Sequence, residues 1–212
     1  MIYLICGYKG SGKDTFFKSL NKENDYKWII YSKGEDLIIK NKIQRLAFAD
    51  DLKILVIDYL KNMYPEFVFT LDYCEQNKDK VLFNGSSFRD YCILIGKNKV
   101  KEDKYYWVNR VKNKITNENI DYFITDFRFP HEYFSNSKTI RVYRSMIKKP
   151  EDKSELYLDN FLTDYLVIPE NDDIISCLNL FPQYRNYIKV NLKFESENTA
   201  PYHIKRDIHI LP

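Results

Sequence analysis

The chain of 212 residues contains 33 basic and 30 acidic residues, mixed along its length, and has a formal net charge of +3. This balance excludes the strong positive field that is typical of proteins that bind nucleic acids or acidic membrane surfaces. Hydrophobic residues make up 44% of the chain, enough for one well-packed domain with a modest appendage. We therefore expect one principal domain, no nucleic-acid partner and no membrane partner.

The cysteines and the apolar runs indicate the cellular setting. Cys6, Cys74, Cys92 and Cys177 are far apart and form no C-x-x-C pair, so neither a zinc site nor a disulfide framework is predicted. Apolar runs stay well below the about 18 residues of a membrane span, and no signal-like region precedes the first strand-like run. The abundance of tyrosine, lysine, asparagine and isoleucine is typical of AT-rich coding sequences, as in many viruses. We expect a soluble cytoplasmic protein, in the host cytoplasm if the source is viral.

The glycine-rich segment 7–15, GYKGSGKDT, is the most informative stretch of the chain. It follows the apolar run 2–6, short enough for a buried parallel strand, and it precedes the helix-compatible run 14–20. Strand, glycine-rich loop and helix in this order match the G-x-x-x-x-G-K phosphate-binding loop, whose amides and lysine hold the phosphates of a nucleoside triphosphate. The residues expected to bind these phosphates are Gly7, Lys9, Gly10, Ser11, Gly12, Lys13, Asp14 and Thr15.

One position in this loop departs from the usual pattern. A Ser or Thr normally follows Gly-Lys and offers its hydroxyl to Mg²⁺, whereas here Asp14 comes first and Thr15 follows. The Asp14 carboxylate is expected to hold the cation directly, to hold it through water, or to cap the helix, where the dipole favours an acid. The sequence leaves these three interpretations open.

Further strands and helices are predicted after the loop. Residues 28–31 fit a short strand, and residues 35–43 fit a helix. The apolar run 45–49 predicts a strand, and residues 50–60 predict a helix, because their apolar residues recur at helical spacing behind two aspartates. Pro65 ends that second strand–helix unit.

The middle of the chain is less regular. Residues 66–101 are polar, with one helix-like patch at 86–95 that contains Arg89 and is predicted to stop at Gly96. Residues 103–115 again have helical character, because their large apolar residues fall on or near one face.

An apolar strand is predicted at 120–126, where it ends in Asp126. A carboxylate at the carboxyl end of a parallel strand beside a phosphate-binding loop faces the metal–phosphate cluster in many nucleotide-binding proteins. Aspartate at a strand end also commonly forms a turn, and both interpretations stay open, although the loop in the same chain favours the first. The next residues place Arg128 near the phosphate end of the predicted sheet.

The last third of the chain predicts a strand at 139–144, a core strand at 165–168 and a helix that starts within 171–178. Between the two strands, the basic stretch 148–155 is either an ordinary solvated face or a mobile lid that carries positive charge onto a transferring phosphoryl group. In the tail, the period-two alternation of residues 187–194 predicts an edge strand or hairpin. The three histidines are isolated and are assigned no catalytic role.

Several separated motifs occur in a characteristic order. They are GSGKDT at 10–15, AFAD at 47–50 with Leu52 and Lys53, Arg89 ahead of Gly96, YWV at 106–108, TDFRF at 125–129 with Glu132, KSE at 153–155, and Asn171 with Asp172. This succession resembles the phage-type deoxynucleoside monophosphate kinases. The resemblance covers roughly residues 1–180, and its most specific parts are the Gly-Lys-Asp-Thr loop and the Asp-Phe-Arg-Phe segment.

The resemblance implies an α/β fold of the P-loop nucleoside-monophosphate-kinase type, with a central parallel sheet of about five strands flanked by helices. We accordingly expect a kinase domain over residues 1–180 with a lid at about 145–160, and a small C-terminal β extension over residues 181–212 packed on the same domain. Such enzymes move a phosphoryl group from ATP to a deoxynucleoside monophosphate with Mg²⁺. Many are homodimers, so a homodimer is an expectation here.

Residue roles follow from the resemblance and from the demands of phosphoryl transfer, in which positioning and charge neutralisation supply most of the rate. Lys13, Arg128 and Arg144 are the expected catalytic residues, with Arg141 or Lys148 as a second lid cation beside Arg144. Lys53, Arg89 and Arg128 are expected to bind the acceptor phosphate, which a guanidinium fork fits bidentately. Asp14, Thr15 and Asp126 are expected to surround Mg²⁺.

Two other functions stay open. Animal-type phosphomevalonate kinases look similar around Gly-Lys-Asp and provide an alternative enzyme. The chain also departs from the family pattern, with Asp51 where proline is usual and Lys97-Asn98-Lys99 where a Thr-Glu-containing segment is usual. The altered Lys97-Asn98-Lys99 region keeps a second alternative open, a kinase-derived binding or scaffold protein that has lost turnover.

Overall fold

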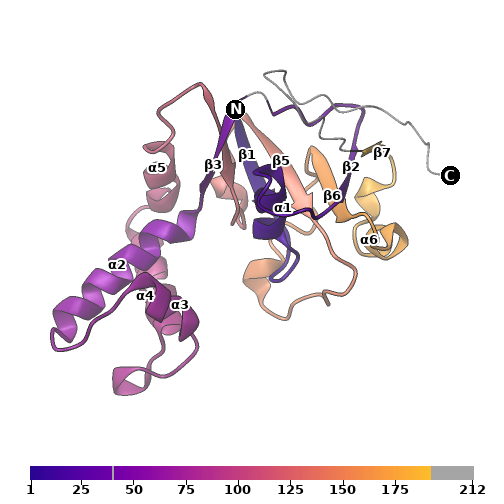
Figure 1. Cartoon of the computed structure of the whole chain (residues 1–212). Coiled ribbons are helices and arrows are strands. Elements are labelled where there is room, and N and C mark those ends of the chain that lie inside the picture. Colours follow the sequence, from indigo (N-terminus) through magenta and orange to yellow (C-terminus); the bar gives the residue numbers. More distant parts are fainter. Residues whose placement is uncertain (40, 192–212) are drawn as a thin grey trace. The chain divides into compact units, whose positions relative to one another are not determined.

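A computed structural model of the chain describes residues 1–39 and 41–191 (Figure 1). The chain divides into two compact units. We call residues 1–46 and 117–212 the sheet unit and residues 47–116 the helical unit. The predicted boundary between a kinase domain and an extension at residue 181 stays a prediction.

The described residues of the sheet unit form one seven-stranded sheet with the order β3-β4-β1-β5-β6-β2-β7 (Figure 1). The strands are β1 (Ile2–Cys6), β2 (Trp28–Ser32), β3 (Lys42–Leu46), β4 (Ile120–Ile124), β5 (Ser137–Val142), β6 (Tyr165–Pro169) and β7 (Ile188–Asn191). The neighbours from β3 to β6 are all parallel, whereas β2 pairs antiparallel with both β6 and β7. The predicted α/β class, with a largely parallel central sheet flanked by helices, is confirmed.

Helices cover both faces of this sheet. The helical elements of the sheet unit are α1 (Lys13–Leu20), η2 (Pro130–Glu132), η3 (Lys153–Glu155), α6 (Ile174–Leu180) and η4 (Pro182–Tyr184). On one face, Phe16 and Leu20 of α1 pack in a core cluster with Tyr3 and Ile5 of β1. On the other face, α6 and η4 pack in a separate cluster that includes Leu166 of β6. Successive strand residues point to opposite faces of a sheet. Because the central strands are apolar at nearly every position, both of their faces are buried under helices.

The helical unit contains α2 (Phe48–Met63), α3 (Leu71–Gln76), η1 (Phe83–Gly85), α4 (Phe88–Glu102) and α5 (Tyr106–Lys112). Val56 and Leu60 of α2 pack with Phe88 of α4 in its buried core. Helix α4 begins with a capping box, in which the Ser87 hydroxyl accepts the Asp90 amide and the Asp90 carboxylate accepts the Ser87 amide.

Asp51, which stands where the resembling family has proline, has a structural role within the helical unit. Its buried carboxylate accepts hydrogen bonds from Arg110 Nε at 3.1 Å and Lys114 Nζ at 2.8 Å. The hydrogen bonds from these two cations hold the pKa of Asp51 below its usual value, against the opposing effect of burial. The ion pair between Asp51 and Arg110 joins α2 to α5, so an aspartate at this position has a structural role in the helical unit.

The predicted helix over 35–43 is wrong. The structure has no helix over residues 35–39 or 41–43, and β3 begins at Lys42. Leu37 and Ile39 are buried in an extended segment, while the carbonyl oxygen of Ile38 between them accepts the Tyr3 hydroxyl at 2.7 Å. The apolar residues of this segment alternate between buried and exposed, and in the sequence alone they resemble one face of a helix.

The strand predicted over 45–49 lies three residues earlier, as β3 (Lys42–Leu46). Lys42, Gln44 and Arg45 are exposed on this edge strand, so no apolar alternation marks it in the sequence. The apolar residues that suggested a strand instead begin α2, which starts at Phe48.

The sequence predicted that this helix stops at Gly96, but α4 continues to Glu102. A Cβ atom at Gly96 would lie 3.3 Å from Leu52 Cδ2, so the glycine allows α2 to pack closely against α4. This packing explains a glycine inside a helix, where it usually costs about 1 kcal/mol relative to alanine.

The remaining predicted elements are present, with shifted ends. The helix predicted over 103–115 is the shorter α5, and the strands predicted over 120–126 and 139–144 end at Ile124 and Val142. Strand β7 confirms an edge strand within 187–194, whereas residues 192–212 of the predicted extension, including His203 and His209, lie outside the described residues. Among the helices of the described chain, none is both long and apolar enough to cross a membrane.

Candidate functional site

The carboxyl ends of β1, β4 and β5 lie side by side at one edge of the sheet, because these neighbouring strands are parallel. The glycine-rich loop 7–12 follows β1, the segment with Asp126 and Arg128 follows β4, and the segment with Arg144 follows β5. Ligands of open α/β sheets bind outside the carboxyl ends of the strands. The fold therefore brings together the loop and three of the charged residues predicted from the sequence.

The glycines of the loop adopt backbone conformations that other residues rarely take. Gly7, Gly10 and Gly12 have φ angles of 143°, 84° and 93°. A Cβ atom at Gly7 would overlap the carbonyl oxygen of Val142, and one at Gly12 would lie 3.2 Å from the Trp28 ring. The loop is therefore a tight turn packed directly on the backbone of β5.

The ammonium of Lys13 lies over this loop. Lys13 Nζ donates to the carbonyl oxygens of Gly7 at 2.6 Å and Tyr8 at 3.1 Å. Burial lowers the pKa of Lys13, whereas the carboxylate of Glu155 is the strongest influence in the opposite direction. The predicted phosphate-binding lysine is thus held at the loop by its own backbone.

Ser11 provides a buried hydroxyl with unused hydrogen-bonding capacity. The residue is 2% exposed, and its Oγ has no hydrogen-bond partner among the described residues. Its backbone amide donates to the carbonyl oxygen of Tyr8 at 3.0 Å, which closes the turn. An unsatisfied buried polar atom costs free energy, so a polar ligand could supply the hydrogen-bond partner that this hydroxyl lacks.

Asp14 lies in the first turn of α1, and its side chain is 67% exposed. Its carboxylate pairs with Arg45 Nε of β3 at 3.2 Å. The N-cap of α1 is Gly12, which has no side chain to accept a helix amide. The Asp14 carboxylate pairs with Arg45, and it lies where the helix dipole favours an acid. Thr15, also in this turn, is half-buried.

Asp126 follows the end of β4 and is half-buried. Leu4 pairs with Ile124 in the β1–β4 register, and the Phe127 amide donates to the carbonyl oxygen of Ile5 at 3.1 Å. The backbone at Asp126 therefore runs beside the end of β1, where the glycine-rich loop begins.

Arg128 and the loop meet at Glu155, a residue of η3 that ends the KSE motif at 153–155. Arg128 Nη1 lies 3.1 Å from Glu155 Oε1, and the Lys9 amide donates to Glu155 Oε2 at 2.8 Å. One carboxylate thus binds both a loop amide and the predicted acceptor-binding arginine.

Glu132 holds the backbone of the Asp126–Phe129 segment. Its Oε2 accepts the amides of Arg128 at 2.7 Å and Phe129 at 3.0 Å, and the residue is 7% exposed. Burial raises the pKa of Glu132 to about 8, and the charge of Asp126 acts in the same direction. Glu132 occurs among the motif residues, yet its burial and its two amide contacts could not be inferred from the sequence.

Arg144 approaches the loop from the end of β5. A Cβ atom at Gly12 would lie 3.4 Å from Arg144 Nη2, and this guanidinium also donates to the Tyr26 hydroxyl at 3.3 Å and lies over the Tyr26 ring. The next residue is tied down, since the Ser145 amide donates to the Asp172 carboxylate at 2.8 Å. The structure thus places Arg144 beside Gly12 of the loop.

Arg141, considered as a second lid cation, has a different place. It is 2% exposed in β5, where its Nε donates to the Tyr184 hydroxyl at 2.9 Å and its guanidinium lies 4.4 Å from the centre of the Phe181 ring. It also donates to the carbonyl oxygens of Leu158 and Phe161. These contacts make Arg141 a buried anchor for the segment that follows η3.

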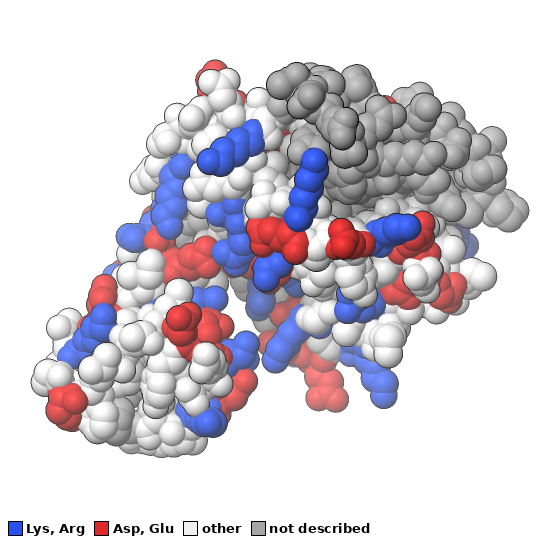
Figure 2. Space-filling model, in the orientation of Figure 1, with Lys and Arg blue, Asp and Glu red and all other residues white. Residues whose placement is uncertain are grey.

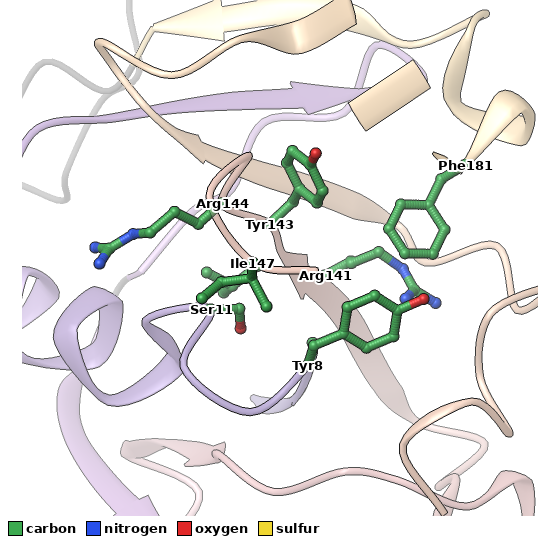
Figure 3. A pocket seen from close by; sticks show the side chains of 9 residues that line it. Tyr8, Ser11, Arg141, Tyr143, Arg144, Ile147 and Phe181 are labelled. Atoms are coloured by element: carbon green, nitrogen blue, oxygen red, sulfur yellow. The ribbon is translucent and has the colours of Figure 1, made fainter. Parts of the chain in front are cut away.

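A small pocket opens between the loop and the segment after β5 (Figure 3). It is lined by Gly7, Tyr8, Ser11, Arg141, Val142, Tyr143, Arg144, Ile147 and Phe181. Figure 3 shows the side chains of Tyr8 and Arg141 near Phe181, with the Arg144 guanidinium pointing away from them. The cavity volume is about 10 Å³, close to what a single water molecule needs, so a nucleotide would extend well outside this pocket.

A second small pocket lies beside it and includes Arg128 and Glu155 among its lining residues, with Gly7 and Tyr8. The two pockets share the beginning of the glycine-rich loop. Their linings combine this loop and three arginines with apolar side chains such as Phe181 and Phe127.

Lys53 and Arg89, predicted to bind the acceptor phosphate, belong to the helical unit. Lys53 Nζ pairs with Glu75 at 3.0 Å, and Arg89 Nη2 donates to Asp79 at 3.3 Å. The hydrogen bond to Asp79 raises the pKa of Arg89. Their role toward an acceptor stays a prediction from the sequence.

Neither the protein-family models nor the curated proteins contain a match to this chain. On the face drawn in Figure 2, Lys and Arg side chains are interspersed with Asp and Glu, as the near-balance of charges in the sequence leads one to expect. The assignment of function therefore depends on the geometry and chemistry of the loop and its neighbours.

Proposed function

We propose that this protein is an ATP-dependent kinase that transfers the γ-phosphoryl group to a (deoxy)nucleoside monophosphate, within a P-loop fold of the nucleoside-monophosphate-kinase type. The main support is the buried strand followed by a tight loop of positive-φ glycines, with Lys13 over the loop and the unpaired Ser11 hydroxyl inside it. Backbone amides and an ammonium at a helix N-terminus are a favourable site for a polyphosphate.

The loop would bind the phosphates of ATP. The amides around Gly10 and Gly12 and the Ser11 hydroxyl offer hydrogen bonds, while Lys13 would exchange its bonds to loop carbonyls for bonds to phosphate oxygens. Donors that are already held at their positions stabilise the charge that develops on the transferring group without reorganisation during the reaction. Arg144, held beside Gly12, would add a second cation on the β5 side.

Mg²⁺ fits the donor set at this edge of the sheet. The residues that would hold it are Asp126, Thr15 and Asp14, of which Asp126 adjoins the end of β1 and Asp14 pairs with Arg45. The described residues contain no cluster of three or more His, Cys, Asp or Glu residues arranged around a metal position. Mg²⁺ bound together with nucleotide phosphates usually takes only one or two protein carboxylates. When bound, the ion neutralises phosphate charge.

The acceptor phosphate would bind Arg128, whose backbone is fixed by Glu132 and whose guanidinium reaches toward the loop at Glu155. A guanidinium fork holds a phosphate in one orientation, which favours in-line attack. The acceptor oxygen is already ionised at neutral pH, so the reaction needs no general base. Lys53 and Arg89 stay candidates for the same phosphate on the basis of the sequence alone.

A panel assay tests this function against its alternatives. Purified full-length protein is incubated with ATP and Mg²⁺ and with each natural nucleoside or deoxynucleoside monophosphate, or with phosphomevalonate, and ADP release is followed by a coupled assay. ADP release that depends on a nucleoside monophosphate supports the proposal. ADP release that depends only on phosphomevalonate would assign the alternative enzyme. If none of the acceptors raises ADP release above the rate with ATP alone, a binding protein without turnover is favoured.

A further inference from the structure

The carboxylate of Glu155 occupies an anion position at the glycine-rich loop. Its Oε2 accepts the Lys9 amide at 2.8 Å, and its Oε1 lies 3.1 Å from Arg128 Nη1. The Glu155 side chain is only 9% exposed. A loop amide and an arginine are the two kinds of donor that would bind substrate phosphates here, and both are already engaged by a protein carboxylate.

Lys13 also lies within the electrostatic reach of this carboxylate. Burial lowers the pKa of Lys13, and Glu155 is the strongest influence that opposes the lowering. Glu155 therefore faces cations and donors from two different segments, Lys9 and Lys13 after β1 and Arg128 after β4. A negative group in this place satisfies the same charges that a phosphate would satisfy.

The segment that carries Glu155 is anchored on its C-terminal side. Arg141 donates to the carbonyl oxygens of Leu158 and Phe161, and Asp159 accepts the Tyr8 hydroxyl at 2.9 Å. In contrast, residues 151–157 are exposed or half-buried. Movement of Glu155 out of the loop would expose its carboxylate and loosen the partly buried Leu156, while the anchor at Arg141 would stay in place.

We propose that Glu155 is a built-in competitor of the substrate phosphate, and that the incoming phosphate must displace it from Lys9 and Arg128. This inference depends on the phosphate-binding role proposed for the loop, and it assigns a regulatory role to η3 at that site. Displacement releases the segment at 151–157 when phosphate arrives, so occupation of the site and the position of this segment are coupled.

The coupling has a measurable cost in affinity. A ligand that binds only the form without the Glu155 contact has its apparent affinity reduced by the fraction of molecules in that form. If the contact holds about nine molecules in ten, its loss strengthens binding about tenfold, which corresponds to about 1.4 kcal/mol. Charge-assisted hydrogen bonds are about twice as strong as neutral ones, so an effect of this size is expected.

Binding of inorganic tripolyphosphate by isothermal titration calorimetry tests the proposal on the full chain without requiring turnover. Glu155→Gln removes the charge with little change in shape, and Glu155→Ala removes the side chain. Glu151→Gln is the matched control, because Glu151 is an exposed acid on the same segment. Hydrogen exchange of the Lys9 amide in the unliganded proteins reports directly on the contact.

We expect both Glu155 variants to bind tripolyphosphate about tenfold more tightly than the wild type and to exchange the Lys9 amide faster, while Glu151→Gln stays within about twofold. Equal or weaker binding by the Glu155 variants would overturn the proposal, as would equal tightening in Glu151→Gln. If no protein binds tripolyphosphate, the proposal also fails. If the Glu155 variants bind tripolyphosphate more tightly but no protein forms ADP in the panel assay, Glu155 competes with phosphate as proposed and the kinase function is rejected.

Discussion

The amide of Phe127 donates to the carbonyl oxygen of Ile5 at 3.1 Å, which joins the chain just after β4 to the end of β1. Because of this hydrogen bond, the backbone between Asp126 and Arg128 runs beside the start of the glycine-rich loop. The glycine-rich loop, a carboxylate and an arginine from distant parts of the sequence thereby converge at one edge of the sheet.

Replacement of Lys13 by alanine should reduce kcat by about 10²-fold or more, the usual scale for loss of one preorganised contact to the transition state. Lys18→Ala is the control, because Lys18 is an exposed cation in the last turn of the same helix. Steady-state kinetics of ADP formation measure the effect, and thermal melting of Lys13→Met shows whether loss of the bonds to Gly7 and Tyr8 unfolds the loop. Unchanged turnover in Lys13→Ala would remove Lys13 from the site.

Arg128→Ala should raise the KM of the acceptor and lower kcat together, because the guanidinium holds the acceptor phosphate in the orientation for attack. Arg185→Ala, a change at an exposed arginine after η4, should leave both parameters unchanged. Initial rates at varied acceptor and fixed saturating ATP give the two constants. An effect of Arg128→Ala confined to the KM of ATP would move this arginine to the donor site.

Asp126→Asn should increase the Mg²⁺ concentration needed for half-maximal activity more than Asp14→Asn does. Asp126 adjoins the loop, whereas the Asp14 side chain is 67% exposed and pairs with Arg45. Mg²⁺ titrations of activity at constant ATP compare the two variants. A larger shift in Asp14→Asn would show that the departure from the usual loop pattern creates the main ligand of the ion.

Glu132 should make stability depend on pH. Its pKa in the folded protein is about 8, against an ordinary value of 4.5, so between these values the folded state binds a proton that the unfolded state has lost. The stabilisation is complete below about pH 4.5 and is lost as pH rises through about 8, by at most about 1.4 kcal/mol per pH unit. Denaturant unfolding from pH 5 to pH 8 should show this decline in the wild type and a smaller one in Glu132→Gln, which keeps the shape of the protonated acid. Parallel curves for the two proteins would contradict the assignment.

Gly7→Ala should destabilise the protein more than Gly85→Ala does. Both glycines have positive φ angles, so each alanine variant carries a backbone penalty of about 1–2 kcal/mol. A Cβ atom at Gly7 would also overlap the backbone of Val142, whereas one at Gly85 meets no atom within 4 Å among the described residues. We expect a further loss of about 1–3 kcal/mol for Gly7→Ala in the free energy of unfolding. Equal losses would mean that the loop can move away from β5.

The sequence was sufficient for the elements with the strongest patterns. The β1 strand, the glycine-rich loop and α1 follow one another as predicted, because an apolar run, three glycines and an amphipathic helix each carry a local pattern. In contrast, β3 has mostly exposed residues, and Leu37 and Ile39 are buried through tertiary contacts with the sheet. Local patterns do not contain that information.

The site was predictable to a similar extent. The rule that parallel strands end at the same edge predicted Asp126 and Arg128 near the loop, and both segments lie there. Arg144, predicted as a lid cation, also lies beside Gly12 of the loop. The contact between Glu155 and Lys9 joins residues 146 positions apart, and no spacing in the sequence marks it. The capture of a loop amide by a distant carboxylate depends on the folded positions of three segments.

The most direct test of the central claim is transfer of label from [γ-³²P]ATP to a nucleoside monophosphate by the purified full-length protein. We predict that the label appears in the nucleoside diphosphate product, that transfer needs Mg²⁺, and that Lys13→Ala reduces it by about 10²-fold or more. Label that stays in ATP, or appears only as free phosphate with every monophosphate tried, would contradict the account.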